Sequence, residues 1–219
     1  MMYFESRAQA GEVLAEQLYE KYRYENMAVV ALSDGGVAVG EPIAQRLHCV
    51  LTMLVSEAVD VPGENQSFGA VSQAGNFTYN SGLAVSEITE YTTEFHGYLE
   101  EKKREAFQRI NRLLGDGGII DKDLLRDHTI VLVNDGLNDM TSFDVAMDFL
   151  KPIRIERLIV ASPVASVELV DKLHMTADEL HILDVKVNYI GTDHYFEQND
   201  LPTHEETIAK INHIVLNWR

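Results

Sequence analysis

The chain has 219 residues, of which 46% are hydrophobic and 24% are charged, and its formal net charge at pH 7 is −17. This length suits one α/β domain or one domain with a small appendage, and the composition is that of a soluble globular protein rather than a disordered one. The excess of acidic residues argues against a nucleic-acid-binding protein, because such proteins neutralise phosphates with Lys and Arg.

The chain has one cysteine, Cys49, so it cannot form an intrachain disulfide. Cys49 follows a predicted helix and precedes an apolar strand, a position that favours a buried structural thiol. The first ten residues lack the apolar core of a signal peptide, and no apolar run is long enough to span a membrane. We therefore expect a cytoplasmic protein that binds neither membranes nor nucleic acid.

The first quarter of the chain alternates between helix and strand patterns. Apolar residues spaced by three and four predict a helix over residues 10–22. The continuous apolar run at residues 27–32 predicts a strand that is buried on both faces, and a turn follows at residues 33–36. A second helix over residues 39–47 and a strand over residues 50–55 complete a strand–helix–strand unit, which is typical of a parallel sheet.

The segment at residues 60–90 is richer in Gly, Asn and Ser, and it has short strand patterns at residues 69–71 and 83–85. We expect it to be a hairpin or small extension of a single domain that spans residues 1–219. A long polar helix is predicted over residues 90–114, and its charge run at residues 100–105 is typical of a solvated helix face.

The second half repeats the alternation of strands and helices. Strands are predicted at residues 129–133, 155–161 and 180–185, with helices through residues 145–149 and 167–173. The whole pattern indicates an α/β fold with a doubly wound, mainly parallel sheet. Ligands bind such sheets in the loops at the carboxyl ends of the strands, which here are residues 33–36, 56–63 and 134–142.

The third of these loops carries a family resemblance. The sequence V-N-D-G-L-N-D-M-T-S, which begins at Val133, resembles the type I phosphoribosyltransferase signature, an apolar strand followed by D-D-G-x-x-T-G-x-T. Other landmarks resemble a bacterial subgroup of that family in the same order along the chain: Phe4, Arg7, and residues 32–39, 69–71, 160–165, 177–179 and 195–198. The resemblance covers nearly the whole chain and implies the type I phosphoribosyltransferase fold.

The resemblance also implies a reaction, in which a nitrogen acceptor displaces pyrophosphate from phosphoribosyl pyrophosphate with Mg²⁺ bound. Such an anionic substrate needs backbone amides at a helix N-terminus for its 5-phosphate, cations or a metal for its pyrophosphate, and carboxylates for its ribose hydroxyls. The residues in the matching loops are Asp34, Gly35, Gly36, Glu57, Asn134, Asp135, Gly136, Asp139, Thr141 and Ser142. A homodimer is expected because the family often forms one.

These loops depart from the family pattern in their charges. Asp34 stands where the family has Arg, and a Ser-Glu pair ending at Glu57 stands where it usually has Arg-Lys. In the signature, Asn134 replaces the first acid, Asp139 replaces the first Thr, and Met140 replaces the following Gly. Two like charges about 4 Å apart repel by about 4 kcal/mol at an effective dielectric constant near 20. We therefore predict that binding of phosphoribosyl pyrophosphate is impaired.

Three other interpretations use the same acids. Asp139 can be a helix cap in a site that no longer works. Asp34, Glu57, Asp135 and Asp139 can instead converge as oxygen ligands of Mg²⁺ or Ca²⁺, with Asp135 and Asp139 as the first candidates. The loop N-D-G-L-N-D also resembles haloacid-dehalogenase-like phosphatases, which would make Asp135 essential, but the first strand is followed by S-D-G-G and not by the D-x-D of that family.

Two functions from different classes remain open, and no catalytic residue is identified for either. The first is a non-catalytic phosphoribosyltransferase-fold module that binds an unknown small molecule or protein, and no cofactor is assigned to it. The second is an active transferase with Mg²⁺, for which the retained residues Gly35, Gly36, Asp135, Thr141 and Ser142 argue. A third interpretation lies between these two functions: the cleft of the family binds a cationic or neutral ligand.

Overall fold

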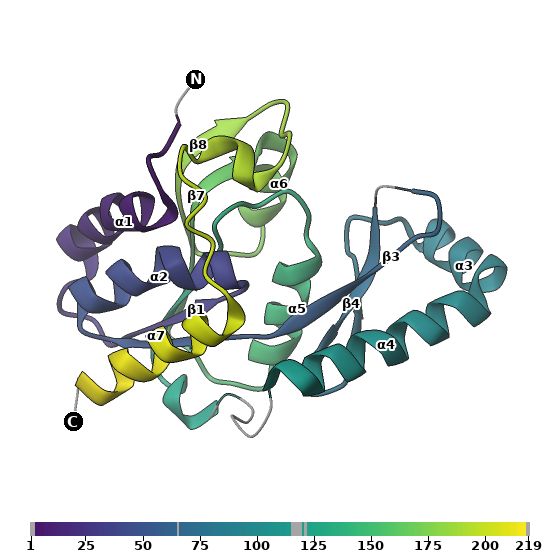
Figure 1. Cartoon of the computed structure of the whole chain (residues 1–219), viewed down its shortest axis with the longest axis horizontal. Coiled ribbons are helices and arrows are strands. Elements are labelled where there is room, and N and C mark those ends of the chain that lie inside the picture. Colours follow the sequence, from purple (N-terminus) through teal and green to yellow (C-terminus); the bar gives the residue numbers. More distant parts are fainter. Residues whose placement is uncertain (1–2, 65, 115–119, 121, 218–219) are drawn as a thin grey trace. The chain divides into compact units, whose positions relative to one another are not determined.

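The computed structural model describes residues 3–64, 66–114, 120 and 122–217 and divides the chain into two compact units, each with its own sheet (Figure 1). The first unit comprises Met1–Met53, Asp121–Asn138 and Ile153–Arg219. The second comprises Leu54–Ile120 and Asp139–Pro152. That the chain forms a single domain stays a prediction.

The first unit is built on a parallel sheet in which every strand pairs in parallel with its neighbours. The five strands are β1 (Met27–Ala31), β2 (Val50–Met53), β6 (Thr129–Val133), β7 (Arg157–Ser166) and β8 (Glu179–Lys186), in the spatial order β2-β1-β6-β7-β8. The central strands β1 and β6 are buried at every residue, as their continuous apolar sequences predict. The predicted parallel sheet is therefore confirmed.

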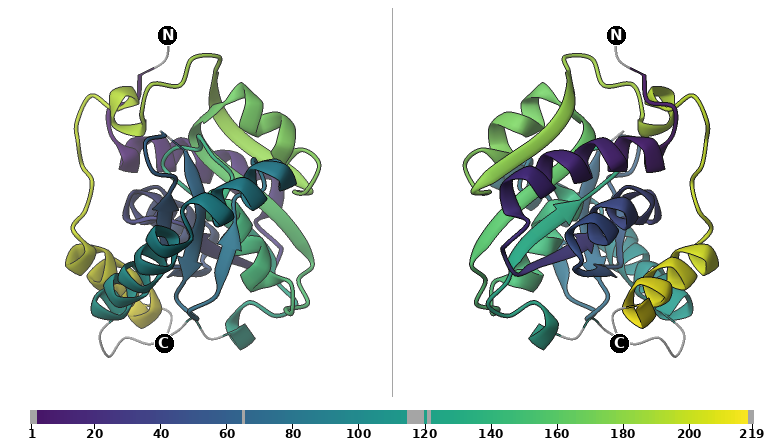
Figure 2. Two further views of the ribbon diagram at one scale, coloured as in Figure 1. Left: turned by 90° about the vertical axis from the view of Figure 1, so that its right-hand side faces the viewer. Right: turned by 90° about the vertical axis from the view of Figure 1, so that its left-hand side faces the viewer.

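Helices cover both faces of this sheet (Figure 2). The helices α1 (Arg7–Tyr22) and α2 (Asp34–Leu47) lie side by side on one face, and α6 (Val167–Leu173) lies on the other. The chain moves along the sheet in one direction from β1 to β2 and in the opposite direction from β7 to β8. Because both crossovers are right-handed, their helices α2 and α6 must lie on opposite faces of the sheet. The predicted doubly wound arrangement is also confirmed.

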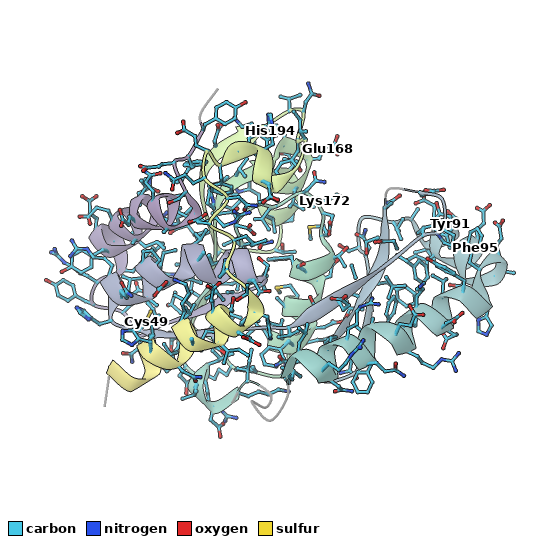
Figure 3. The ribbon with its side chains drawn as sticks, viewed as in Figure 1. Cys49, Tyr91, Phe95, Glu168, Lys172 and His194 are labelled. Atoms are coloured by element: carbon cyan, nitrogen blue, oxygen red, sulfur yellow. The ribbon has the colours of Figure 1, made fainter. Side chains whose placement is uncertain are left out.

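The core of the first unit joins the sheet to α1 and α2. Val29, Val131 and Ile159 of the strands are fully buried together with Leu14 of α1. Cys49 is buried beside them (Figure 3), and burial raises the pKa of its thiol to about 12. The cysteine is thus the structural thiol that its sequence position predicted, since it holds its proton at neutral pH.

A C-terminal helix, α7 (His204–Asn217), was not predicted. Its start carries a reciprocal cap, in which the Thr203 hydroxyl accepts from the Glu206 amide at 3.3 Å and the Thr203 amide donates to the Glu206 carboxylate at 2.8 Å. The Thr-x-x-Glu pattern of a capping box was therefore the signal for this helix.

The second unit has a small antiparallel sheet covered by helices. Its elements are β3 (Ser56–Asp60), β4 (Ser67–Ser72), β5 (Phe77–Tyr79), α3 (Val85–Glu94), α4 (His96–Leu114) and α5 (Thr141–Leu150). The strand predicted at residues 83–85 is wrong, because the Glu87 carboxylate accepts from the Ala84 amide at 2.7 Å and helps to start α3 there. The single helix predicted over residues 90–114 is two helices that meet at Phe95. Within the described ranges, no helix has both the length and the apolar character that a bilayer crossing requires.

Candidate functional site

Two of the three candidate loops meet in the first unit, at the carboxyl ends of β1 and β6. These strands pair with Ala31 opposite Val133, so the loops that follow them start side by side. Ser33 joins the loops, because its hydroxyl donates to Asn134 Oδ1 at 2.5 Å and lies 3.1 Å from Asp135 Oδ1. The same hydroxyl accepts from the Gly36 amide at 2.8 Å and so caps α2.

The Gly35 backbone lies against the Asp135 carboxylate. A Cβ atom at Gly35 would overlap both carboxylate oxygens of Asp135, and one at Gly36 would come within 2.7 Å of the Val133 carbonyl. The Gly-Gly pair is therefore required by the close approach of the two loops, whether or not a ligand binds there.

The retained signature carboxylate, Asp135, is held by a buried arginine from α1. Arg7 Nε donates to Asp135 Oδ2 at 2.8 Å, and the two side chains are only 1% and 11% exposed. The rest of the guanidinium binds a segment near the C-terminus: it donates to Asn199 Oδ1 at 3.0 Å, pairs with Asp193, and lies 3.6 Å from Asp200 Oδ1. The guanidinium carbon also lies 4.7 Å from the centre of the Phe196 ring.

The charge of Arg7 is fixed by these neighbours. Burial lowers the pKa of the guanidinium, but the hydrogen bonds and charges of Asp135 and Asp193 raise it, and together they place it above its usual value. The sequence identified Arg7 only as a landmark of the resemblance and missed this role. The sequence signal for this role was the position of Arg7 on the apolar stripe of α1, in line with Ala10 and Leu14. A cation on the buried side of a helix needs a buried anion as its partner.

The third residue of the signature, Gly136, is covered by the chain that follows β8. A Cβ atom at Gly136 would overlap the Tyr189 hydroxyl and the side chain of Thr192. These two hydroxyl oxygens are 2.8 Å apart and share a hydrogen bond. Burial raises the pKa of Tyr189 to about 12, and the nearby charge of Asp135 adds to that rise. The backbone at Gly136 is thus packed against neutral side chains of this chain.

Asp34, the acid of the first loop, also has an internal partner. Its Oδ1 lies 3.1 Å from Nδ1 of His204, the first residue of α7. Asp34 is in addition the first residue of α2, where a negative charge is favoured by the helix dipole. Lys210 of α7 pairs with Glu41 of α2, so the two helices are joined at a second point.

Glu57 lies in the second unit, and the loop predicted at residues 56–63 is wrong. Residues 56–60 form strand β3, in which Glu57 stands opposite Val71 of β4. The antiparallel pairing with β4 holds this segment extended where a loop was expected. The Glu57 carboxylate accepts from Arg109 Nε of α4 at 2.5 Å. The predicted ligand residue is therefore part of an ion pair between a strand and a helix.

Asp139, also in the second unit, lies before the first turn of α5. Its Oδ1 accepts from the Thr141 amide at 2.8 Å, but the N-cap of α5 is Met140, one residue further on, so the helix-cap role of Asp139 stays a prediction. The Thr141 hydroxyl is buried and has no hydrogen-bond partner, whereas Ser142 is half-buried. The Asp139 carboxylate thus takes one of the amides that an anion would use at this helix start.

The metal interpretation requires several acids in one place. Across residues 3–64, 66–114, 120 and 122–217, no group of three or more His, Cys, Asp or Glu side chains could hold a metal ion. Asp34 and Asp135 belong to the first unit and Glu57 and Asp139 to the second, and each has a protein partner within its own unit. Binding of Mg²⁺ or Ca²⁺ by these residues stays a prediction.

Comparisons with known proteins agree with the fold. A family model for the phosphoribosyl transferase domain matches residues 3–197. The crystal structure of TT1426 from Thermus thermophilus is 25% identical, with a TM-score of 0.71 and 99% of each chain covered. The AQ2163 protein from Aquifex aeolicus is 10% identical, with a TM-score of 0.50, 82% of this chain covered and 74% of that one. The purine phosphoribosyltransferase from Pyrococcus horikoshii is 12% identical, with a TM-score of 0.47, 92% of this chain covered and 96% of that one. Because the family model matches most of its length, the chain belongs to the phosphoribosyl transferase domain family and has the type I phosphoribosyltransferase fold.

Proposed function

We propose that this phosphoribosyltransferase-fold protein is impaired in binding phosphoribosyl pyrophosphate and acts as a non-catalytic binding or regulatory module. The observation that carries the proposal is the buried ion pair between Arg7 and Asp135. In the family signature this carboxylate is expected to hold the ribose hydroxyls of the substrate. Here it holds a guanidinium of its own chain.

The free energy of this pair opposes a ligand. Asp135 accepts from Arg7 at one oxygen and lies within hydrogen-bond distance of Ser33 at the other, and its side chain is 11% exposed. Breaking a buried ion pair by removing one partner costs about 3–5 kcal/mol. A ribose would have to offset an energy of this order before it gained any net affinity from Asp135.

The other acids add to the same effect. A phosphate brought to about 4 Å from the Asp34 carboxylate would be repelled by about 4 kcal/mol at an effective dielectric constant near 20. Asp139 occupies an amide at the start of α5 with a negative charge of its own. The acids are also held by internal partners, namely His204, Arg109 and a helix amide, which supports a structural role for them.

One observation favours the second function, an active transferase that uses Mg²⁺ and an unknown nitrogen acceptor. The Thr141 hydroxyl is buried at the start of α5 without a hydrogen-bond partner, where a phosphate oxygen could accept from it. Membership of the phosphoribosyl transferase family also replaces the haloacid-dehalogenase-like interpretation of the same loop.

Calorimetric titration with phosphoribosyl pyrophosphate, with and without Mg²⁺, separates the two functions. We expect no binding up to millimolar concentration in either condition. Micromolar binding would overturn the proposal and would direct the work to a screen of nitrogen acceptors. With no binding, affinity capture and light scattering would test for the protein partner and for the expected homodimer.

A further inference from the structure

Residues 187–200, which we name the strap, cross the carboxyl ends of the strands in the first unit. The strap leaves β8 at one edge of the sheet, and the chain then enters α7, which packs on α2 and on β2 at the other edge. It therefore passes over the ends of β6 and β1. Figure 1 shows the chain running from β8 to α7, and His194 lies on this segment in Figure 3. In this course it covers the loops that hold Asp135 and Gly136.

The strap contacts those loops through two groups of side chains. Tyr189 and Thr192 lie over the backbone of Gly136. Asp193, Asn199 and Asp200 reach Arg7, and the Asp200 carboxylate also accepts from the Arg7 amide at 2.9 Å. The guanidinium of Arg7 is therefore bonded to the strap on one side and to Asp135 on the other.

Few buried contacts hold the strap otherwise. Tyr195 and Phe196 are its buried residues, and the remainder of residues 187–200 are exposed or half-buried. Phe196 packs with Phe4 and Ala10 and forms a parallel bridge with Phe4. Three backbone hydrogen bonds of 2.9 Å join residues 195–198 of the strap to Phe4 and Glu5. A segment with little buried surface has a low free energy of local opening, so a few polar contacts decide whether it is closed.

We propose that the strap is a lid over the family's ligand-binding loops and that Arg7 is the latch that keeps it closed. The inference rests on the proposed function in one respect, namely that the loops it uncovers are the ones that would bind a ligand. When the latch opens, Tyr189 and Thr192 leave Gly136, and Arg7 and Asp135 become accessible to solvent. A ligand enters this site only in the open form.

The burial of the carboxylates determines which side of the latch opens. Asp135 is 11% exposed, whereas Asp200 is 28% exposed and Asp193 is 64% exposed. Ion pairs with exposed members contribute less than buried ones, because water screens them, and a buried pair is costly to break. The contacts with the strap are thus the weaker ones, and Arg7 stays on Asp135 when the lid opens.

Hydrogen exchange followed by mass spectrometry on the full-length protein tests the latch. We expect Arg7→Ala to raise the amide exchange rates of the strap at least about tenfold more than those of β1 and β6, which exchange through global unfolding. Arg46→Ala is the matched control, because Arg46 lies in the same unit and pairs with Glu16 on the surface at 3.1 Å. Guanidinium ion, added far below unfolding concentrations, should restore the protection of the strap in Arg7→Ala.

A second variant keeps the test valid if Arg7→Ala does not fold. The double substitution Asp193→Asn with Asp200→Asn leaves the buried pair of Arg7 and Asp135 intact and removes both strap charges. We expect the same selective rise in strap exchange and no response to guanidinium ion. Unchanged strap exchange in the variants that fold, or a rise of equal size in β1 and β6, would overturn the latch.

The outcome is independent of the calorimetric test of the proposed function. If the wild-type protein binds phosphoribosyl pyrophosphate but its strap opens in the variants, the proposed function fails and the latch stands. If the wild-type protein does not bind it and the strap exchange is unchanged, the latch fails and the proposed function stands.

Discussion

Replacing Arg7 with Met would remove the positive charge from the site while keeping much of the volume of the side chain. Asp135 would then be a buried carboxylate without its cationic partner, since its side chain is 11% exposed. Breaking a buried pair in this way costs about 3–5 kcal/mol, against a total stability of about 5–15 kcal/mol for a typical protein. We therefore expect the variant to lose about a fifth or more of its free energy of unfolding.

Urea unfolding followed by circular dichroism would measure this loss, with the second substitution Asp135→Asn as the control. In an Arg7→Met background, Asp135→Asn removes the unpaired charge and should recover at least about 1 kcal/mol, although the same substitution alone should be destabilising. The raised pKa of Arg7 means that the arginine keeps its charge at every pH of such an experiment. A loss below about 1 kcal/mol for Arg7→Met would refute the reasoning, because the pair would then behave like a surface ion pair.

Three further predictions concern the strap and the loops. Folding raises the pKa of Tyr189 from 10.0 to about 12, so the neutral phenol stabilises the folded protein fully below pH 10, and this stabilisation is lost as the pH rises toward 12. Tyr189→Phe should therefore reduce the loss of stability at alkaline pH. It should also remove the tyrosine that ionises late in an ultraviolet titration. Gly136→Ala should displace the strap, because the new Cβ overlaps two of its side chains, and should destabilise the protein by about 1–3 kcal/mol in urea unfolding. Asp34→Arg, Glu57→Lys and Asp139→Thr together should raise the affinity for phosphoribosyl pyrophosphate in calorimetry, and an unchanged affinity would mean that these residues do not face the ligand.

The sequence predicted the central sheet well because its signal is local. A run of apolar residues such as 129–133 reports burial on both faces, and the alternation with helices reports parallel strands. Helix α6 begins and ends where its apolar spacing predicts. The second unit was predicted less well because its helix α3 is short and buries none of its residues fully, so its apolar stripe of Val85, Ile88 and Tyr91 is a weak signal.

The site was only partly predictable, for a different reason. Sequence motifs located Asp34, Gly35 and Asp135 near one another, and the pairing of β1 with β6 brings their loops together. Their partners were beyond reach, because Arg7 and His204 lie 128 and 170 residues away from the acids that they contact. A single sequence shows which positions are buried or charged, but it does not show which distant charge neutralises which.

The pairing of Arg7 with Asp135 also bears on whether the site has simply lost its ligand-binding function. A buried ion pair is on average no more stabilising than a well-packed apolar pair of the same volume, because desolvation of the two charges offsets their attraction. Stability alone therefore gives no reason to keep two charges under the strap. A guanidinium bonded both to a buried acid and to two more exposed acids can instead release the exposed side and keep the buried one. The arrangement suits a cover that opens over a site better than it suits a sealed core.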